Sequence, residues 1–406
     1  MHGFLSFYEY DRLYSTSTHV LSILLTGTDN LLACRVSFES STYFKVMMLL
    51  LSSIAAASTL IPSTMQALVC RSELTNKSYA SMDGWRATLP LPTLAPNSND
   101  VLIQVAYASV NPCDIDLVKS DEAILATLLH KTLGFDVSGT IVAVGSAVSD
   151  RLNVGDAVWA DLGEFGLGPT RKVVEMGAFA EFALADAGQV GVKPRGLSFA
   201  QAGVVPLVGL TNLEALNAAG APWWDRTNVT LVITSGQGGT GHLAIQMAKA
   251  LGADRVITAA STANLEWVRS LGADVVIDYT KESLWSALPN DSVDVVYDNF
   301  GAAGSADAAM TKLRSGGALV MIQGTLSAHP KAGTTQSKIL CKANNYTRLD
   351  ALSDMVAAGN LSVVRIFENK SWPLAQIGEA YDTLAAGHAL GKVSVKVEGG
   401  GGGIRG

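Results

Sequence analysis

The sequence predicts an α/β protein with a mainly β domain and a second domain built on a doubly wound parallel sheet. From Met65 the chain has short β-branched or alternating runs, such as DVLIQVAYASV and GTIVAVG, separated by Gly, Pro and Asp turns. After Pro206 the pattern changes to runs such as VTLVIT and DVVIDY, which are apolar enough for strands buried on both faces. Helical stretches such as HLAIQMAKALG lie between several of these strands, an alternation that is typical of βαβ units.

The composition indicates a globular protein with a small-molecule partner. Its 406 residues are 48% hydrophobic, so the chain can bury large cores and is long enough for two or three domains. The formal net charge is −7 and Lys and Arg form no cluster, which disfavours nucleic acid or an anionic membrane surface as a partner. We expect no stable membrane span in the part of the chain that follows Met65.

Residues 1–64 differ from the rest of the chain and include a segment that resembles a secretory signal. They are rich in Ser and Thr without clear periodicity, and Lys45 precedes an apolar run with small residues over 46–58. A signal should begin the chain, so either Met47 or Met48 is the true start, or the run belongs to an organellar or unstructured extension. Cytoplasmic, organellar and secreted locations stay open, the first two being favoured. The N-x-Ser/Thr sequons that are compatible with secretion lie at Asn76, Asn228, Asn290, Asn345, Asn360 and Asn369.

The predicted domain boundaries follow these changes in pattern. We expect an extension over 1–64, a β domain over 65–206, a parallel-sheet domain over 207–341, a last folded segment over 342–398 and a Gly-rich tail over 399–406. In the last segment two helical stretches lead to the strand KVSVKV. Local pattern leaves open which of the two sheets this strand joins.

A glycine-rich turn between a predicted strand and a predicted helix indicates a dinucleotide site. The stretch VTLVITSGQGGTGHLAIQ carries Gly236-x-Gly238-x-x-Gly241, with Gly239 and Thr240 inside the motif. Glycines permit the tight turn and let backbone N–H groups approach a pyrophosphate at the positive end of the helix. A turn that only packs helix against sheet is the alternative, but the strand–turn–helix context favours the dinucleotide.

The residue at the end of the next strand favours NADPH over NADH. Sites for NAD place an Asp or Glu about twenty residues beyond the glycines, where it binds the ribose hydroxyls. Here the corresponding residue is Ser261, which would not repel a 2′-phosphate and can donate a hydrogen bond to it. No Lys or Arg follows until Arg269, so the cation for that phosphate is expected elsewhere in the chain.

Taken together, these segments resemble the medium-chain dehydrogenase/reductase superfamily, in its zinc-independent quinone oxidoreductase and enone reductase branch. The resemblance covers roughly Met65 to Val397, and its motifs in order are VNPCD, LGFDVSGTIVAVG, VGDAVWA, GAFAEFALA, PLVGLTN, SGQGGTG, VIDY and GKVSV. It implies a GroES-like β domain that is split in sequence around a Rossmann domain, with the active site in the cleft between them. It also implies that the last strand returns to the β domain and that the protein is a homodimer.

The resemblance further implies a site without metal. The first zinc-binding cysteine of the zinc-dependent members corresponds to Asn111 and the zinc-binding histidine to Phe135, while Cys113 stands at a proton-relaying Ser or Thr. The structural-zinc lobe needs four closely spaced cysteines, but the four cysteines of this chain are scattered singly. The neighbouring Asp114 and Asp116 are interpreted as solvated turn carboxylates or as residues of a helix N-terminus.

Two polar residues are expected, by family position, at the reacting end of the cofactor. Asn111 is expected to be a polar anchor near the nicotinamide and its ribose, and Thr211 to lie beneath the ring. Each residue also has an ordinary structural interpretation. Asn111 precedes Pro112 and suits a turn, and Thr211 with Glu214 suits the capping box of a helix.

Two further residues are expected, by family position, to bind the cofactor. Tyr279 of VIDY resembles a residue that contacts the adenosine 2′-phosphate, although a strand-end aromatic is the alternative. Lys392 of GKVSV occupies a position common in the family, although it also suits a solvated strand start. Related reductases often carry a lysine after the Ser261 region, where this chain has Leu265.

The function that these features predict is hydride transfer from NADPH to quinones or α,β-unsaturated carbonyl compounds. Such acceptors take up hydride without a Lewis acid, so the protein mainly has to position the reactants and exclude water. A 2-enoyl thioester reductase is the alternative within the enzymes, since the same chemistry serves both. A dinucleotide-binding protein with little turnover is the alternative outside them, because an intact glycine loop is compatible with either.

Overall fold

The computed structural model of the chain consists of two compact units, Met1–Ser63 and Thr64–Gly406. The signal-like segment over 46–58 and the Gly-rich tail over 399–406 lie outside the described residues. The residues that the structure describes are 5–6, 19–26, 31–38, 61–69, 79–119, 132–163, 177–339 and 346–397.

The first unit contains a small antiparallel sheet. β2 (His19–Thr26) pairs with β3 (Leu31–Phe38) along its whole length, and β1 (Leu5–Ser6) pairs with the end of β2. The sequence did not indicate these strands, because its Ser/Thr-rich runs show no clear alternation of apolar and polar residues.

The second unit begins with a mainly β region built around a seven-stranded sheet. The strand order is β10-β8-β7-β6-β18-β17, and β9 also pairs with β6. Alternation along β6 directs Val101, Ile103 and Val105 into the core beneath the sheet. A separate hairpin joins β4 (Thr64–Leu68) to β5 (Arg86–Pro90). The strands of the sheet are β6 (Asp100–Val110), β7 (Asp136–Val144), β8 (Ala157–Asp161), β9 (Phe182–Asp186), β10 (Val190–Val192), β17 (Ile366–Pro373) and β18 (Lys392–Lys396).

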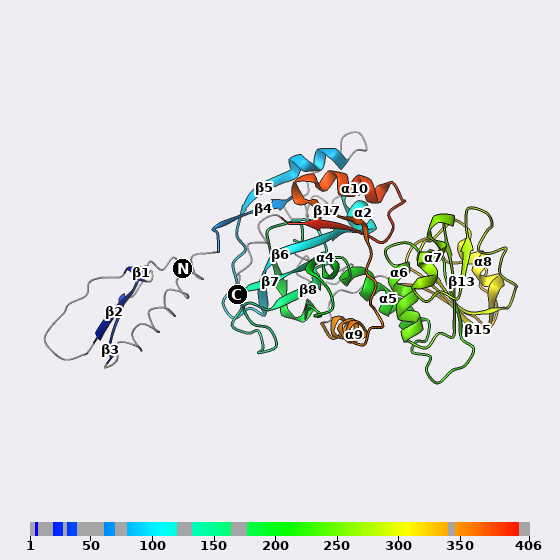
Figure 1. Cartoon of the computed structure of the whole chain (residues 1–406), viewed down its shortest axis with the longest axis horizontal. Coiled ribbons are helices and arrows are strands. Elements are labelled where there is room, and N and C mark those ends of the chain that lie inside the picture. Colours follow the sequence, from blue (N-terminus) through cyan, green and yellow to red (C-terminus); the bar gives the residue numbers. More distant parts are fainter. Residues whose placement is uncertain are drawn as a thin grey trace. The chain divides into compact units, whose positions relative to one another are not determined.

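The last two strands of the chain lie in this first sheet. β18 pairs with β6 antiparallel, with Val393 opposite Val110, and β17 pairs with β18 in parallel. The red strands near the C-terminus accordingly lie in the same sheet as the cyan strand β6 (Figure 1), with β18 between β6 and β17. The final strand therefore returns to the β region, as the family resemblance implied.

A six-stranded parallel sheet follows in the chain. Its order is β13-β12-β11-β14-β15-β16, and every neighbouring pair is parallel. The order reverses at β11, and in doubly wound sheets ligands bind at the carboxyl ends of the strands beside this point. The strands are β11 (Thr230–Ile233), β12 (Arg255–Ala260), β13 (Val275–Asp278), β14 (Val293–Asp298), β15 (Leu313–Met321) and β16 (Thr335–Lys338).

Helices cover the parallel sheet, as the strand–helix alternation predicted. α6 (Gly241–Ala250) packs on β11 and β12, α7 (Leu265–Ser270) on β13, and α8 (Ser305–Lys312) on β14 and β15. Figure 1 shows these three helices around the strands of the sheet. α7 follows the short 3-10 helix η3 (Thr262–Asn264) directly.

Helix α5 (Pro206–Ala218) links the two sheets. It starts with a proline at its first position, where the missing N–H costs nothing, and it contacts β7 and β8 of the first sheet and β15 of the second. Most of its residues are buried, including the polar Thr211 and Asn212, because the helix packs against both sheets.

The remaining helices surround the first sheet and the junction. They are α2 (Pro112–Lys119), α4 (Phe199–Ala202), α9 (Tyr346–Ala357), α10 (Ile377–Ala385) and the 3-10 turns η1 (Tyr79–Trp85), η2 (Ala187–Gln189) and η4 (Leu374–Gln376). Within the described residues, no helix is long and apolar enough to cross a membrane.

Candidate active site

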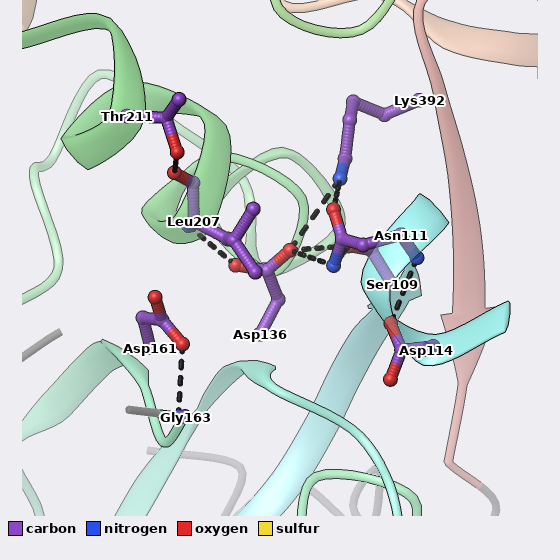
Figure 2. Close-up of polar contacts among 9 residues, drawn as sticks. All are labelled: Ser109, Asn111, Asp114, Asp136, Asp161, Gly163, Leu207, Thr211 and Lys392. Atoms are coloured by element: carbon purple, nitrogen blue, oxygen red, sulfur yellow. Dashed lines mark hydrogen bonds and ion pairs between the residues drawn. The ribbon is translucent and has the colours of Figure 1, made fainter. Parts of the chain in front are cut away.

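A buried polar cluster lies where β6, β7 and β18 meet. Asn111 and Asp136 are fully buried, and Lys392 is only 3% exposed. The Lys392 ammonium donates a hydrogen bond to Asn111 Oδ1 and lies 3.5 Å from Asp136 Oδ2, while Asn111 Nδ2 donates to Asp136 Oδ2 at 2.9 Å (Figure 2). The alternative interpretation of Lys392 as a solvated strand start is therefore wrong.

Strand register brings these side chains together. Ser109 lies opposite Asp136 in the β6–β7 pair, and Val110 lies opposite Val393 in the β6–β18 pair. Asn111 follows β6 and Lys392 precedes Val393, so the two antiparallel pairings place both side chains beside Asp136. Residues from three separate parts of the sequence thus form one group.

Asp136 accepts hydrogen bonds from four residues, which lie in β6, directly after it, in α5 and in β18. Ser109 Oγ donates to Oδ2 at 2.5 Å, and the backbone N–H of Leu207 donates to Oδ1 at 2.7 Å, in addition to the donors of Asn111 and Lys392. Leu207 is in the first turn of α5, whose N–H groups have no partner within the helix. A buried carboxylate is stable only when it is paired and hydrogen-bonded in this way. Asp136 therefore fixes the start of α5 against the first sheet.

The backbone of Asn111 precedes helix α2 and caps its start, as the turn interpretation predicted, while its expected place near the nicotinamide stays a prediction. Its N–H donates to Asp114 Oδ2 at 2.8 Å, and its carbonyl oxygen accepts from the N–H of Asp114. Asp114 is fully buried at the helix N-terminus, and burial raises the pKa of its carboxyl well above the usual value. The interpretation as a solvated turn carboxylate is thus wrong for Asp114, whereas Asp116 is exposed.

Cys113 lies in the first turn of α2 as a free thiol. Burial raises its pKa well above the usual value, and the carboxylates of Asp114, Asp161 and Asp136 raise it further. The nearby Lys392 acts in the opposite direction but less strongly. The side chain is therefore a neutral thiol near neutral pH.

The glycine loop has the tight geometry that a phosphate-binding turn requires. A Cβ on Gly241 would lie 1.7 Å from Ser235 O, and a Cβ on Gly236 would lie 2.6 Å from Thr258 Oγ1. A Cβ on Gly238 would meet nothing closer than Ser235 Oγ, at 3.4 Å. Side chains are excluded on the inner side of the loop, while a ligand can approach the backbone at Gly238 and the N-terminus of α6. These features fit the pyrophosphate of a dinucleotide.

The glycine loop also contacts the segment that carries Lys392. Gly238 forms a β-bridge with Gly391, whose N–H donates to Gln237 O at 3.1 Å. A Cβ on Gly239 would lie 3.0 Å from Lys392 Cδ. The predicted cofactor loop and the buried polar cluster are therefore adjacent.

Gln237 links the two residues predicted at the adenosine end. Its Oε1 accepts hydrogen bonds from Ser261 N at 2.8 Å and Ser261 Oγ at 3.2 Å, and its Nε2 lies 3.5 Å from the hydroxyl of Tyr279. Ser261 follows β12 and Tyr279 follows β13, so both lie at the carboxyl edge of the parallel sheet. Gln237 occupies a variable position of the glycine motif, and sequence reasoning missed it.

Asn299 is a second residue that the sequence did not indicate. It follows β14, and its side chain accepts from Ser235 N and donates to Ser235 O and Thr240 Oγ1, each at 2.9 Å. These bonds hold both ends of the glycine loop. The position of Asn299 at the end of a buried strand, in DNFG, was the available signal.

Comparison with known proteins places the chain in a family. Residues 97–195 match the family described as "Alcohol dehydrogenase GroES-like domain", and residues 239–348 match the family described as "Zinc-binding dehydrogenase". An NADPH-dependent alkenal/one oxidoreductase of the chloroplast from Arabidopsis thaliana is 35% identical over 301 residues, which are 73% of this chain and 72% of that protein. The chain belongs to the medium-chain dehydrogenase/reductase superfamily, in its quinone oxidoreductase-like branch.

Two further matches agree with this assignment. The 2-methylene-furan-3-one reductase of Solanum lycopersicum is 32% identical over 321 residues, covering 78% of this chain and 76% of that protein. The structure of the quinone oxidoreductase from Coxiella burnetii superposes with a TM-score of 0.67 at 28% identity, covering 82% of this chain and 99% of the other. The predicted α/β fold, with a GroES-like domain and a Rossmann sheet, is confirmed, and the protein is an oxidoreductase.

The polar cluster of this medium-chain dehydrogenase/reductase does not fit a zinc ion. Zinc needs three or four donors in place, and the described residues contain no group of three or more His, Cys, Asp or Glu side chains that could hold a metal. The amide oxygen of Asn111 accepts from an ammonium, and Phe135 is packed in the apolar core.

Thr211 lies inside α5, one turn after the helix begins. Its hydroxyl donates to Leu207 O at 2.7 Å, and the residue is 6% exposed. The capping-box interpretation is wrong, because α5 starts at Pro206 and Glu214 instead pairs with Arg348 at 2.7 Å. Thr211 is joined to the polar cluster through Leu207, whose N–H binds Asp136 (Figure 2). Its expected place beneath the nicotinamide ring stays a prediction.

Proposed function

We propose that this protein is an NADPH-dependent oxidoreductase that transfers hydride to quinones or α,β-unsaturated carbonyl compounds without zinc. The observation that carries the proposal is the contact between the glycine loop and the buried cluster of Lys392, Asn111 and Asp136. The relatives add support, since their names specify alkenal/one oxidoreductase, furanone reductase and quinone oxidoreductase.

The cofactor is NADPH, and the chain offers residues for each part of it. The loop from Gly236 to Gly241 and the N-terminus of α6 suit the pyrophosphate. β12 does not end in a carboxylate. Gln237 instead contacts Ser261, which follows β12, and Tyr279, which follows β13. When bound, NADPH supplies the hydride from C4 of its nicotinamide.

The buried cluster provides a cation and an amide in fixed positions. A Lys ammonium has three N–H donors, and Lys392 has two polar partners among the described residues, Asn111 and Asp136. The remaining donor is available to bind the dinucleotide beside Gly239. The N–H donors of Lys392 and Asn111 need not change position when the reaction starts, because Asp136 already holds both side chains in place.

The protein in solution is proposed to be a homodimer with the domain boundaries given above. The GroES-like domain then comprises 65–206 and 342–398, and the NADP-binding domain comprises 207–341. The dimer rests on the family resemblance alone, and light scattering after size-exclusion chromatography measures it directly.

NADPH consumption across a panel of quinones, enones and 2-enoyl thioesters tests the proposed function. We expect turnover of quinones or enones by the wild type and a strong loss with Lys392→Met. The matched control is Lys396→Met, because Lys396 lies on the same strand but is exposed. Turnover of enoyl thioesters alone would assign the alternative reductase activity, and tight NADPH binding without any turnover would assign a dinucleotide-binding protein.

A further inference from the structure

The basic residues that follow β12 most closely in the sequence are already engaged in ion pairs. Arg269, the first basic residue after Ser261, pairs with Glu266 at 2.5 Å. Lys281, which follows Tyr279, pairs with Asp278 at 3.1 Å. A 2′-phosphate carries more than one negative charge near neutral pH. A cation from another part of the chain is therefore needed beside it.

Arg365 brings a cation to this region from the segment before β17. Its guanidinium carbon lies 4.6 Å from the ring centroid of Trp267, in the first turn of α7. α7 and the preceding η3 follow Ser261 directly. Arg365 is half-buried, and within the described part of the chain it forms no ion pair. A guanidinium that stacks on a tryptophan keeps its planar donors oriented for a phosphate.

The backbone of Arg365 is fixed to the same loop that binds Ser261. Its carbonyl oxygen accepts from Lys392 N at 2.9 Å, and the adjacent Gly391 donates to Gln237 O, whose side chain binds Ser261. Gly391 has φ +74°, and a Cβ there would lie 2.2 Å from Arg365 O. Only glycine permits this close approach. Arg365 and Ser261 are therefore both anchored through Gln237.

His242 lies near both Lys392 and Arg365 and stays neutral. Burial lowers the pKa of His242 to about 4, and the charges of Lys392 and Arg365 contribute to the shift. Its Nε2 accepts from Arg365 N at 3.3 Å, so Nδ1 carries the hydrogen and donates to Gly238 O at 2.9 Å. The positive charge around the glycine loop thus comes from Arg365 and Lys392.

We propose that Arg365 binds the 2′-phosphate of NADPH and makes the enzyme select NADPH over NADH. This inference rests on the proposed function, because it assigns a residue to one group of the same cofactor. Arginine suits the task, since its guanidinium binds phosphate oxygens in a bidentate manner. Ser261 can redirect its hydroxyl from Gln237 to a phosphate oxygen, and Trp267 orients the guanidinium.

Titration of the full-length protein with NADPH and with NADH, followed by calorimetry, tests the proposal. We expect Arg365→Gln to weaken NADPH binding by roughly 10- to 100-fold and to leave NADH binding nearly unchanged, as for the loss of a hydrogen bond between charged groups. Arg365→Lys keeps the cation but loses the bidentate geometry, so its loss is smaller. Arg269→Gln is the matched control and should bind both dinucleotides like the wild type.

The possible outcomes separate this inference from the proposed function. Unchanged NADPH affinity in Arg365→Gln, or an equal loss for NADPH and NADH, would overturn the role of Arg365 at the 2′-phosphate. A wild-type protein that binds neither dinucleotide would overturn the proposed function and this inference together. Thermal unfolding of each variant without cofactor identifies a general loss of structure, and Arg365→Lys then carries the comparison.

Discussion

Lys392 donates a hydrogen bond to Asn111 although 281 residues separate them in the chain. The contact exists because β18, the last strand, inserts beside β6 in the first sheet. The same segment touches the glycine loop at Gly238 and Gly239. One short stretch near the C-terminus therefore connects the site for cofactor phosphates to the buried polar cluster.

The ion pair of Lys392 and Asp136 should be strongly coupled to stability. Asp136→Asn leaves a buried ammonium without its carboxylate, so we expect a loss of about 3–5 kcal/mol in the free energy of unfolding. In the double variant Asp136→Asn/Lys392→Met no unpaired charge remains, and part of this loss should be recovered. Urea denaturation of the wild type, both single variants and the double variant measures the coupling. Additive losses would show that the two side chains do not interact.

Gly238 and Gly241 should respond differently to alanine. In Gly241→Ala the new Cβ collides with a backbone oxygen, so we expect a lower melting temperature and no NADPH binding. Gly238→Ala has room within the protein, so its melting temperature should stay near that of the wild type. Its Cβ nevertheless blocks the approach of a phosphate, and NADPH affinity should fall at least roughly tenfold. Wild-type affinity in Gly238→Ala would place the pyrophosphate elsewhere.

His242 should make stability depend on pH between about 4 and 6.5. Its pKa is about 4 in the folded chain and 6.5 in the reference state, so the unfolded chain binds the proton more readily in this interval. The contribution is fully present above pH 6.5 and is lost as the pH falls to 4. Its size is roughly 3 kcal/mol, at about 1.36 kcal/mol per pKa unit.

Chemical denaturation across this pH range measures the contribution of His242. The difference in unfolding free energy between wild type and His242→Asn should shrink as the pH falls from 6.5 to 4. His388→Asn is the control, because His388 is exposed. A difference in unfolding free energy that stays constant with pH would contradict the conclusion that His242 is a buried, neutral side chain.

Cys113 should react slowly with electrophiles. Burial and three nearby carboxylates raise the pKa of its thiol, and the thiolate is the reactive form. At neutral pH we expect iodoacetamide to alkylate Cys113 more than roughly tenfold more slowly than glutathione, as followed by mass spectrometry of the peptide. Alkylation as fast as that of glutathione would contradict the raised pKa. A protected thiol is useful beside enone substrates, which themselves alkylate thiolates.

Local pattern was sufficient for the parallel sheet and the glycine loop. Buried strands such as β11 and β12 are largely apolar runs, and the loop is a contiguous motif between a strand and a helix. The position of β18 was different, because a single strand carries no mark of its partner. Only the family resemblance predicted that it returns to the β domain.

The residues that were missed act through contacts that local sequence does not encode. Asp136 stands in a strand whose neighbours are apolar, and its four donors come from other elements. Gln237 fills an unspecified position of a motif, and Arg365 reaches Trp267 from almost one hundred residues away. A carboxylate at the start of a largely apolar strand was the one signal that pointed to Asp136 in advance.

The central claim is hydride transfer from NADPH to an activated alkene without metal, and isotope labelling tests it most directly. Chelator-treated protein is mixed with an enone and NADPH that carries deuterium on the transferred position of C4, and the product is analysed by mass spectrometry. We predict a saturated ketone with one deuterium on the carbon β to the carbonyl. A product without deuterium, or a reaction that starts only when zinc is added, would contradict the account.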